Sequence, residues 1–197
     1  MKKILTFITF LIIILSSISK VHSIEADIFI QSTVNRAAKT LGGNLTKEER
    51  VEKLKDIARD TVDINGIGIY SLGPHKKNLT KKQLIKYKKL FAEYFLKSFS
   101  SRLAEYSNPE IEVDSKKVIN KNYTIVSSTL IATESRPKVK IEWRVYTKDP
   151  KNFLIRDLII EGLSLVRTQK EELNSIISSN DNNIDFLFVS LNQFINK

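Results

Sequence analysis

The sequence predicts an α+β protein in which helices pack on the concave face of a twisted antiparallel β-sheet. Two observations lead to this prediction. In the first half, about residues 24–107, apolar residues recur at steps of three and four, the period of an amphipathic helix. In the second half, about residues 108–197, apolar and polar residues alternate as in half-buried strands, and two further helices follow.

The first 23 residues have the pattern of a cleavable export signal. Lys2 and Lys3 precede an almost unbroken apolar run, Ile4 to Leu15, and Val21-His22-Ser23 offers small or moderate residues for cleavage. The alternative is a membrane anchor, but the run has about a dozen apolar residues, whereas a bilayer-spanning helix needs roughly 20. We therefore expect a signal peptide over residues 1–23 and a single domain over residues 24–197.

Composition limits the function classes. A hydrophobic content of 42% is typical of a globular protein, and the absence of cysteine excludes disulfides and lipid attachment at a cysteine. Together with the export signal this favours the periplasm. The formal charge of +10 could attract anionic lipid or nucleic acid, but the lysines are spread along the chain without arginine–aromatic alternation. We therefore interpret them as solvating residues and expect no nucleic-acid partner.

The helical half begins with apolar residues near helical spacing over residues 24–39. Thr46 with Glu49 three positions later forms a capping box, which opens a second helix over residues 46–59. The glycine-containing segment 62–72 predicts short helical pieces that turn against one another.

The longest predicted helix runs from Thr80 to about Tyr106 and ends before Asn108-Pro109. Its apolar stripe is mostly aromatic and is most simply explained as core, although it is wide enough to line a cavity. The stripe consists of Leu84, Tyr87, Phe91, Tyr94, Phe95, Phe99, Leu103 and Tyr106.

The stranded half predicts a short strand at 111–113, a long one at 118–133, and a hairpin of strands 138–147 and 153–160. In strand 138–147 alternate residues share one apolar face, namely Val139, Ile141, Trp143 and Val145. Helices over 168–178 and 184–195 complete the predicted fold.

The sequence offers little for catalysis. His75 is the only histidine outside the signal, so with no cysteine the usual zinc sites cannot form, and no nucleophile-elbow or phosphate-binding glycine motif occurs. Asp157 and Glu161 share one face of an apolar strand, where a buried carboxylate with a raised pKa could abstract a proton. The alternative is that they accept structural hydrogen bonds, and we favour this interpretation.

The segment Phe153-x-Ile155-x-Asp157, continuing through Glu161-Gly162 to Leu165, resembles the signature of the MlaC (toluene-tolerance) family. These proteins are periplasmic phospholipid carriers of Gram-negative bacteria. Further matches occur upstream in the family's order and extend the resemblance over about residues 28–191. They are Glu49-Arg50, Val62-Asp63, Leu72-Gly73, Thr80-x-x-Gln83 and the aromatic and apolar residues of the long helix.

The resemblance implies a soluble carrier that binds a glycerophospholipid in an apolar cavity, with no cofactor and no catalysis. It also implies delivery between an outer-membrane lipoprotein complex and the substrate-binding subunit of an inner-membrane ABC transporter. The residues expected to line the pocket are Tyr87, Phe91, Tyr94, Phe95, Phe99, Leu103, Ile125, Val139, Ile141, Trp143, Val145 and Ile155. Two alternatives remain: a small exported isomerase or hydrolase that uses Asp157 or Glu161, and a docking protein with a solid core.

Elementary energetics set the requirement for such a carrier. A phospholipid has roughly 30 methylenes, and exposing each to water costs about 0.8 kcal/mol, so unprotected transfer costs on the order of 20 kcal/mol. The carrier must therefore hide both acyl chains, which predicts a cavity near the upper end of the roughly 300–1,000 Å³ range of ligand pockets.

Overall fold

The structure is a computed structural model that describes residues 25–106 and 108–197. The predicted signal peptide and its cleavage after Ser23 lie outside the described residues. In the part of the chain that is described, no helix is both long and apolar enough to cross a membrane.

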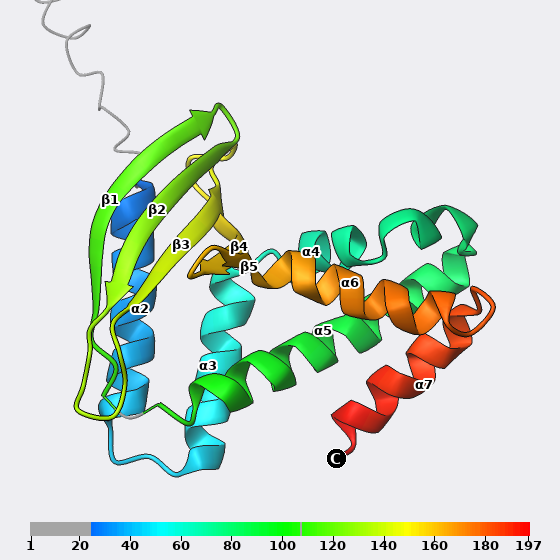
Figure 1. Cartoon of the computed structure of the whole chain (residues 1–197), viewed down its shortest axis with the longest axis horizontal. Helices are drawn as coiled ribbons and strands as arrows, with labels where there is room; N and C mark the ends of the chain where they lie inside the picture. Colours follow the sequence, from blue (N-terminus) through cyan, green and yellow to red (C-terminus); the bar gives the residue numbers. More distant parts are fainter. Residues whose placement is uncertain (1–24, 107) are drawn as a thin grey trace, which may run out of the picture.

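The fold has two parts, a helix-covered sheet and a lobe made of helices (Figure 1). Helices α2 (Ala26–Gly42) and α3 (Lys47–Thr61) belong to the first part, and α2 contacts strands β1 and β2. What we call the helical lobe extends to one side of the sheet. It consists of α4 (Ile64–Ser71), the 3₁₀ helix η1 (Gly73–Asn78), the N-terminal half of α5 (Lys81–Leu103), α6 (Leu165–Ser178) and α7 (Ile184–Ile195).

The sheet is antiparallel with the simple order β1-β2-β3-β4-β5. Its strands are β1 (Ile111–Asn120), β2 (Tyr123–Leu130), β3 (Val139–Tyr146), β4 (Leu154–Ile160) and β5 (Leu163–Ser164). Burial alternates along β2 and β3, and Val126, Ile141, Trp143 and Val145 are buried beneath the helices. We call this the inner face and the opposite one the outer face. These findings confirm the predicted α+β class.

The prediction of a short strand at 111–113 and one long strand at 118–133 is wrong. The chain reverses at Lys121-Asn122, so the segment forms two paired strands, β1 and β2. Asn120 makes this reversal because its side-chain oxygen accepts a hydrogen bond from the Asn122 backbone N–H at 2.9 Å. The turn contains no glycine or proline, and two irregularities in β1 disturb its alternation.

The starts of α3, α5 and α6 follow the chemistry of their caps. Thr46 and Glu49 form the predicted capping box of α3, and Thr80 and Gln83 form an equivalent one at α5. Helix α6 begins at Leu165, three residues before the predicted start, because the Ser164 hydroxyl accepts from the Arg167 N–H and caps the first turn.

The junction between α3 and α4 is tied to β4. Val62 bridges to Ile155, and the Asp63 N–H donates to the Ile155 carbonyl at 2.9 Å. Arg156 donates to Asp63 at 2.6 Å and to the Tyr123 hydroxyl at 2.7 Å. Burial lowers the pKa of Arg156, but these two hydrogen bonds outweigh it and leave the pKa raised. The junction therefore connects the helices firmly to the sheet.

The core continues from the sheet into the helical lobe. In the lobe, Tyr87 is fully buried and its hydroxyl donates to the Gly68 carbonyl at 2.9 Å. Gly68 lets α4 approach closely, because a Cβ there would lie 2.7 Å from Phe91. Phe91, Phe95 and Phe99 then stack along α5, with centroid separations of 6.1 Å and 5.7 Å. This aromatic row connects the lobe to the space under the sheet.

Candidate functional site

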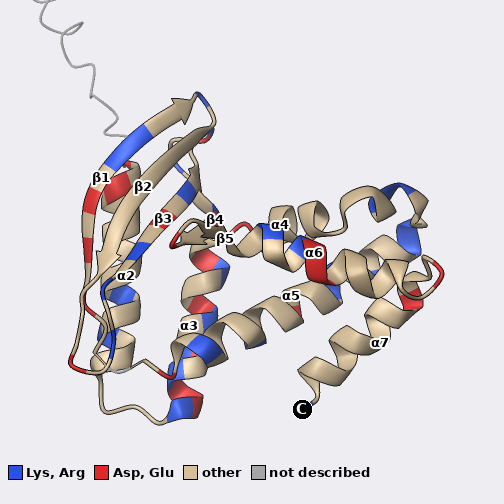
Figure 2. Ribbon diagram, viewed as in Figure 1, with Lys and Arg blue, Asp and Glu red and all other residues tan. Residues whose placement is uncertain are grey.

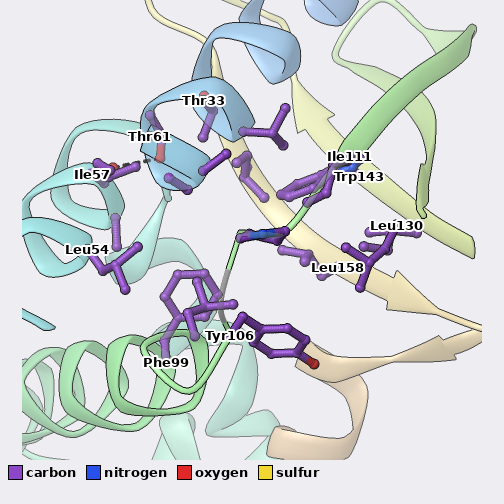
Figure 3. A pocket seen from close by; sticks show the side chains of 18 of the residues that line it. Thr33, Leu54, Ile57, Thr61, Phe99, Tyr106, Ile111, Leu130, Trp143 and Leu158 are labelled. Atoms are coloured by element: carbon purple, nitrogen blue, oxygen red, sulfur yellow. Dashed lines mark hydrogen bonds between the residues drawn. The ribbon is translucent and has the colours of Figure 1, made fainter. Parts of the chain in front are cut away.

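An apolar cavity lies between the inner face of the sheet and helices α2, α3 and the C-terminal half of α5 (Figure 3). Its volume is about 260 Å³. The sheet contributes Ile111, Leu130, Val139, Ile141, Trp143, Ile155, Leu158 and Ile160. The helices contribute Thr33, Val34, Ala37, Ala38, Leu41, Leu54, Ile57, Ala58, Thr61, Phe99 and Leu103, and Val62 follows the end of α3. Tyr106 and Pro109 complete the wall.

Small side chains help to create this space. Ala37 and Ala38 on α2 and Ala58 on α3 occupy wall positions where larger side chains would take up part of the cavity. Figure 3 shows Leu54 and Ile57 of α3, Thr33 of α2 and Phe99 of α5 arranged around the same space as Trp143 and Leu158 of the sheet. The cavity is therefore a place where three helices and the sheet meet without closing fully.

The few buried polar side chains of the wall are already hydrogen-bonded within the protein. The hydroxyls of Thr33 and Thr61 donate to the carbonyls of Phe29 and Ile57 in their own helices, at 2.8 Å and 2.7 Å. The Trp143 indole N–H donates to the Ser128 hydroxyl at 2.8 Å. No residue that lines the cavity is charged. A wall with its donors satisfied and no charge favours apolar ligands over water or polar substrates.

One end of the cavity reaches the surface beside a cation. Tyr106 lines the cavity and is also exposed, and the Arg136 guanidinium lies over its ring, 5.4 Å from the centroid. Arg136 donates from one terminal nitrogen to the Ile131 carbonyl at 3.3 Å. Its buried Nε has no hydrogen-bond partner among the described residues. We call Tyr106, Pro109 and Arg136 the rim.

The structure places the twelve residues predicted to line a lipid pocket in three different environments. Phe99, Leu103, Val139, Ile141, Trp143 and Ile155 lie on the cavity wall. Tyr87, Phe91, Tyr94, Phe95 and Val145 belong to the core or pack against it without lining the cavity. Ile125 lies on the outer face, opposite Arg144. Whether the six wall residues contact a lipid stays a prediction.

Residues of α2 and α3 were missed by the sequence reasoning. Both helices show an apolar stripe in the sequence, but the stripe by itself indicates only a buried face. The small side chains of Ala37, Ala38 and Ala58 are the signal in the sequence that could have indicated an unfilled space beside these helices. The cavity is also smaller than the predicted upper end of the ligand-pocket range, and on one side of it α2 packs against strands β1 and β2.

Asp157 and Glu161 lie on the outer face, away from the cavity. Asp157 is 4% exposed, and its two oxygens accept hydrogen bonds from the Ser164 hydroxyl at 2.7 Å and the Val166 N–H at 3.1 Å. Arg144 lies 4.0 Å from the same carboxylate. Glu161 is exposed and accepts from the Lys140 N–H. Asp157 therefore joins β4 to the start of α6. Separately, the described residues contain no cluster of histidine and acidic side chains that could hold a metal ion.

Comparison with known proteins gives a family and a fold. The family model described as MlaC protein matches residues 31–193, which confirms the resemblance predicted from the sequence. The solved structure of a phospholipid-binding protein from Ralstonia solanacearum, in complex with a phospholipid, superposes with a TM-score of 0.73 at 17% sequence identity. The alignment covers 87% of this chain and 97% of the Ralstonia chain. Among curated protein sequences no significant match was found.

Proposed function

This chain belongs to the MlaC protein family, and from this premise we propose that it binds a glycerophospholipid, with the acyl chains in the apolar cavity and the headgroup at the rim. The observation that carries the proposal is the cavity wall, which is uncharged and has its buried polar side chains hydrogen-bonded within the protein. Such a wall replaces water around hydrocarbon and requires no catalytic group and no cofactor.

The similarity of fold to the Ralstonia protein, whose structure contains a phospholipid, supports the same proposal. The carboxylates available for the enzymatic alternative lie elsewhere. Asp157 uses both oxygens to hold the β4–α6 connection, and neither Asp157 nor Glu161 lines the cavity. Binding or transport is therefore favoured over isomerase or hydrolase chemistry.

A complete phospholipid requires the cavity to widen. The volume of about 260 Å³ is below the roughly 300–1,000 Å³ of ordinary ligand pockets, whereas both acyl chains must be covered to avoid a cost on the order of 20 kcal/mol. The walls able to move are α2 and the N-terminal part of α3. Helix α2 contacts the sheet through side chains, and α3 is tied to β4 at its C-terminal end, where Val62 and Asp63 meet Ile155, while the strands are held to one another by backbone hydrogen bonds. We infer that α2 and the N-terminal part of α3 move away from the sheet when lipid enters.

The headgroup would lie at the rim. Arg136 offers a guanidinium cation, and its contact with the ring of Tyr106 holds that cation beside the cavity. A phosphate diester is an anion that guanidinium groups bind well. The rim therefore suits the phosphate of a phospholipid whose chains enter the cavity.

The family also supports a wider role. As a carrier in the periplasm, the protein would collect the lipid at one membrane complex and deliver it to another, an outer-membrane lipoprotein complex on one side and the substrate-binding subunit of an inner-membrane ABC transporter on the other. A cleavable signal over residues 1–23 fits this role, because a carrier must leave the membrane at which it is made.

Native mass spectrometry of the protein purified from a bacterial periplasm tests the lipid-binding proposal. We expect one phospholipid per chain in the wild type. Ala38→Phe fills part of the cavity and should abolish the bound lipid while the protein stays folded, because the added ring occupies space that is already open.

The matched control is Ala92→Phe, which changes another half-buried helical alanine that does not line the cavity. This variant should retain lipid. Lipid bound equally by both variants, or absent from the wild type, would contradict the assignment of this cavity.

A further inference from the structure

The far end of the helical lobe carries a dense group of lysines. Seven of them lie within residues 76–89, all are exposed, and this segment contains no acidic residue. They are Lys76, Lys77, Lys81, Lys82, Lys86, Lys88 and Lys89. None of them takes part in an ion pair among the described residues. Figure 2 shows basic residues gathered over η1 and the start of α5, away from the sheet. We call this group, with the apolar residues described next, the lysine tip.

The placement of these lysines does not serve helix stability. Lys81 and Lys82 lie in the first turn of α5, where the positive end of the helix dipole disfavours cations, and that turn has no acidic residue. The acidic residue nearest to residues 76–89 in the sequence is Glu93. Asp181 and Asp185 belong to the α6–α7 turn and to the first turn of α7, so all three acidic residues lie outside the lysine-rich segment. The tip therefore keeps a concentrated positive potential at its surface.

Large apolar side chains are also exposed on the two helices that meet at this end of the lobe, α5 and α7. Ile85 is 70% exposed and has lysines three and four positions away on both sides, which places them around it on the helix surface. On the adjoining helix α7, Phe186 and Val189 are 50% and 53% exposed. The two helices are neighbours here, because the Lys86 ammonium lies over the Phe188 ring at 4.6 Å.

We propose that the lysine tip binds the surface of a bilayer that contains anionic phospholipid. Lysines around exposed aliphatic and aromatic side chains match a layer of anionic headgroups above hydrocarbon, since the ammonium groups stay at the headgroups while the apolar side chains enter the interface. An acidic protein surface would satisfy the charge but would leave Ile85, Phe186 and Val189 without an apolar partner. The bilayer accounts for both halves of the surface.

This inference rests on the proposed function, since it states how a lipid carrier reaches a membrane. Its test measures adsorption of the protein to vesicles and does not measure lipid uptake into the cavity. Lipid-loaded protein is sedimented with vesicles of phosphatidylcholine alone, or of equal parts phosphatidylcholine and phosphatidylglycerol. We expect binding to the anionic vesicles only, weakened by added salt. Lys81→Gln, Lys82→Gln, Lys88→Gln and Lys89→Gln together should lower the partition coefficient by at least about tenfold.

The control removes four lysines of the sheet region with the same change in net charge, Lys117→Gln, Lys121→Gln, Lys148→Gln and Lys151→Gln. It should bind nearly as the wild type does. Phe186→Ser with Val189→Ser should remove the binding that persists at high salt. Equal losses in the two lysine variants would overturn the proposal, as would wild-type protein that binds polyglutamate beads but no vesicles. If the purified protein contains no phospholipid but still binds anionic vesicles, the result contradicts the proposed lipid-carrying function and leaves the proposal for the lysine tip in place.

Discussion

Tyr87 shows at the scale of one residue how the helical lobe is held together. Its side chain is fully buried, and its hydroxyl reaches the carbonyl of Gly68 across the contact between α5 and α4. Burial raises the pKa of Tyr87 well above the ordinary tyrosine value of about 10, because the phenolate would lose its hydration. The neutral form is therefore the one that the fold stabilises.

The sign of the resulting pH dependence follows from this shift. The contribution of Tyr87 to stability is fully present below about pH 10, and it is lost as the pH rises above that value, where the unfolded chain ionises first. Tyr87→Phe should lower the free energy of unfolding at pH 7 by about 1 kcal/mol, because it removes one buried hydrogen bond. Tyr87→Phe should also reduce the loss of stability between pH 9 and 11. Urea unfolding at a series of pH values measures both effects. A pH dependence equal to that of the wild type would mean that ionisation of Tyr87 does not cause the loss.

Arg136 and Trp143 allow the rim to be tested separately from the cavity. Trp143 is the only tryptophan in the sequence and lies on the cavity wall, so its fluorescence should report lipid entry. Arg136→Ala should weaken phospholipid binding by about tenfold, because it removes a charge-assisted contact to the phosphate. Binding of a diacylglycerol, which has no phosphate, should be unaffected.

Arg144→Ala is the control for this experiment, since Arg144 is an arginine of the outer face. It should leave both titrations unchanged. Equal weakening of phospholipid and diacylglycerol binding by Arg136→Ala would mean that Arg136 supports the shape of the rim and does not contact the headgroup.

At the scale of elements, the connection between β4 and α6 depends on Asp157. Asp157→Asn leaves only one acceptor oxygen for the two donors, Ser164 and Val166, and removes the charge near Arg144. We expect a loss of about 1–3 kcal/mol in the free energy of unfolding with unchanged lipid content, because the cavity lies on the other face of the sheet. Asp149→Asn, in the exposed β3–β4 turn, is the control and should cost little. Unchanged stability in Asp157→Asn would contradict the structural role assigned to this carboxylate.

Most elements could be predicted from local chemistry. The capping boxes at Thr46 and Thr80 and the alternation in β3 each correspond to an element whose position is correct within a few residues. The β1–β2 hairpin could not be predicted in the same way, because Asn120-Lys121-Asn122 lacks the glycine or proline that usually indicates a reversal. Its side-chain hydrogen bond becomes evident only in the folded backbone.

The cavity was only half predictable, and the reason lies in tertiary packing. The aromatic stripe of α5 is continuous in sequence, but α4 covers Tyr87 and Phe91, while the sheet with α2 and α3 faces Phe99 and Leu103. Periodicity identifies the buried side of a helix and does not indicate which partner lies opposite each turn. The same limit explains why the wall residues of α2 and α3 were not among the residues predicted to line the pocket.

At the scale of the whole molecule, the proposed widening makes a prediction about dynamics. Amide hydrogen exchange should be faster in α2 and α3 after lipid is removed than in the loaded protein, because those helices would lose an apolar partner. The β2–β3 ladder should change little, since its backbone hydrogen bonds do not involve the lipid. If bound lipid instead slows amide exchange equally in the sheet and in both helices, the ligand stabilises the whole fold. That result would contradict a movement of α2 and α3.

Helix α5 is one uninterrupted element of 23 residues that belongs to both parts of the molecule. Ile85, at the lysine tip, and Phe99, on the cavity wall, are separated by about 20 Å along its axis. A rigid rod of that length fixes the distance between the adsorbing end and the cargo. A protein resting on its tip would therefore hold the lipid beyond the headgroup layer, with water between them. Arrival at a membrane and exchange of cargo would then be separate steps, and the molecule would have to tilt or be taken over by a second protein before a lipid could cross.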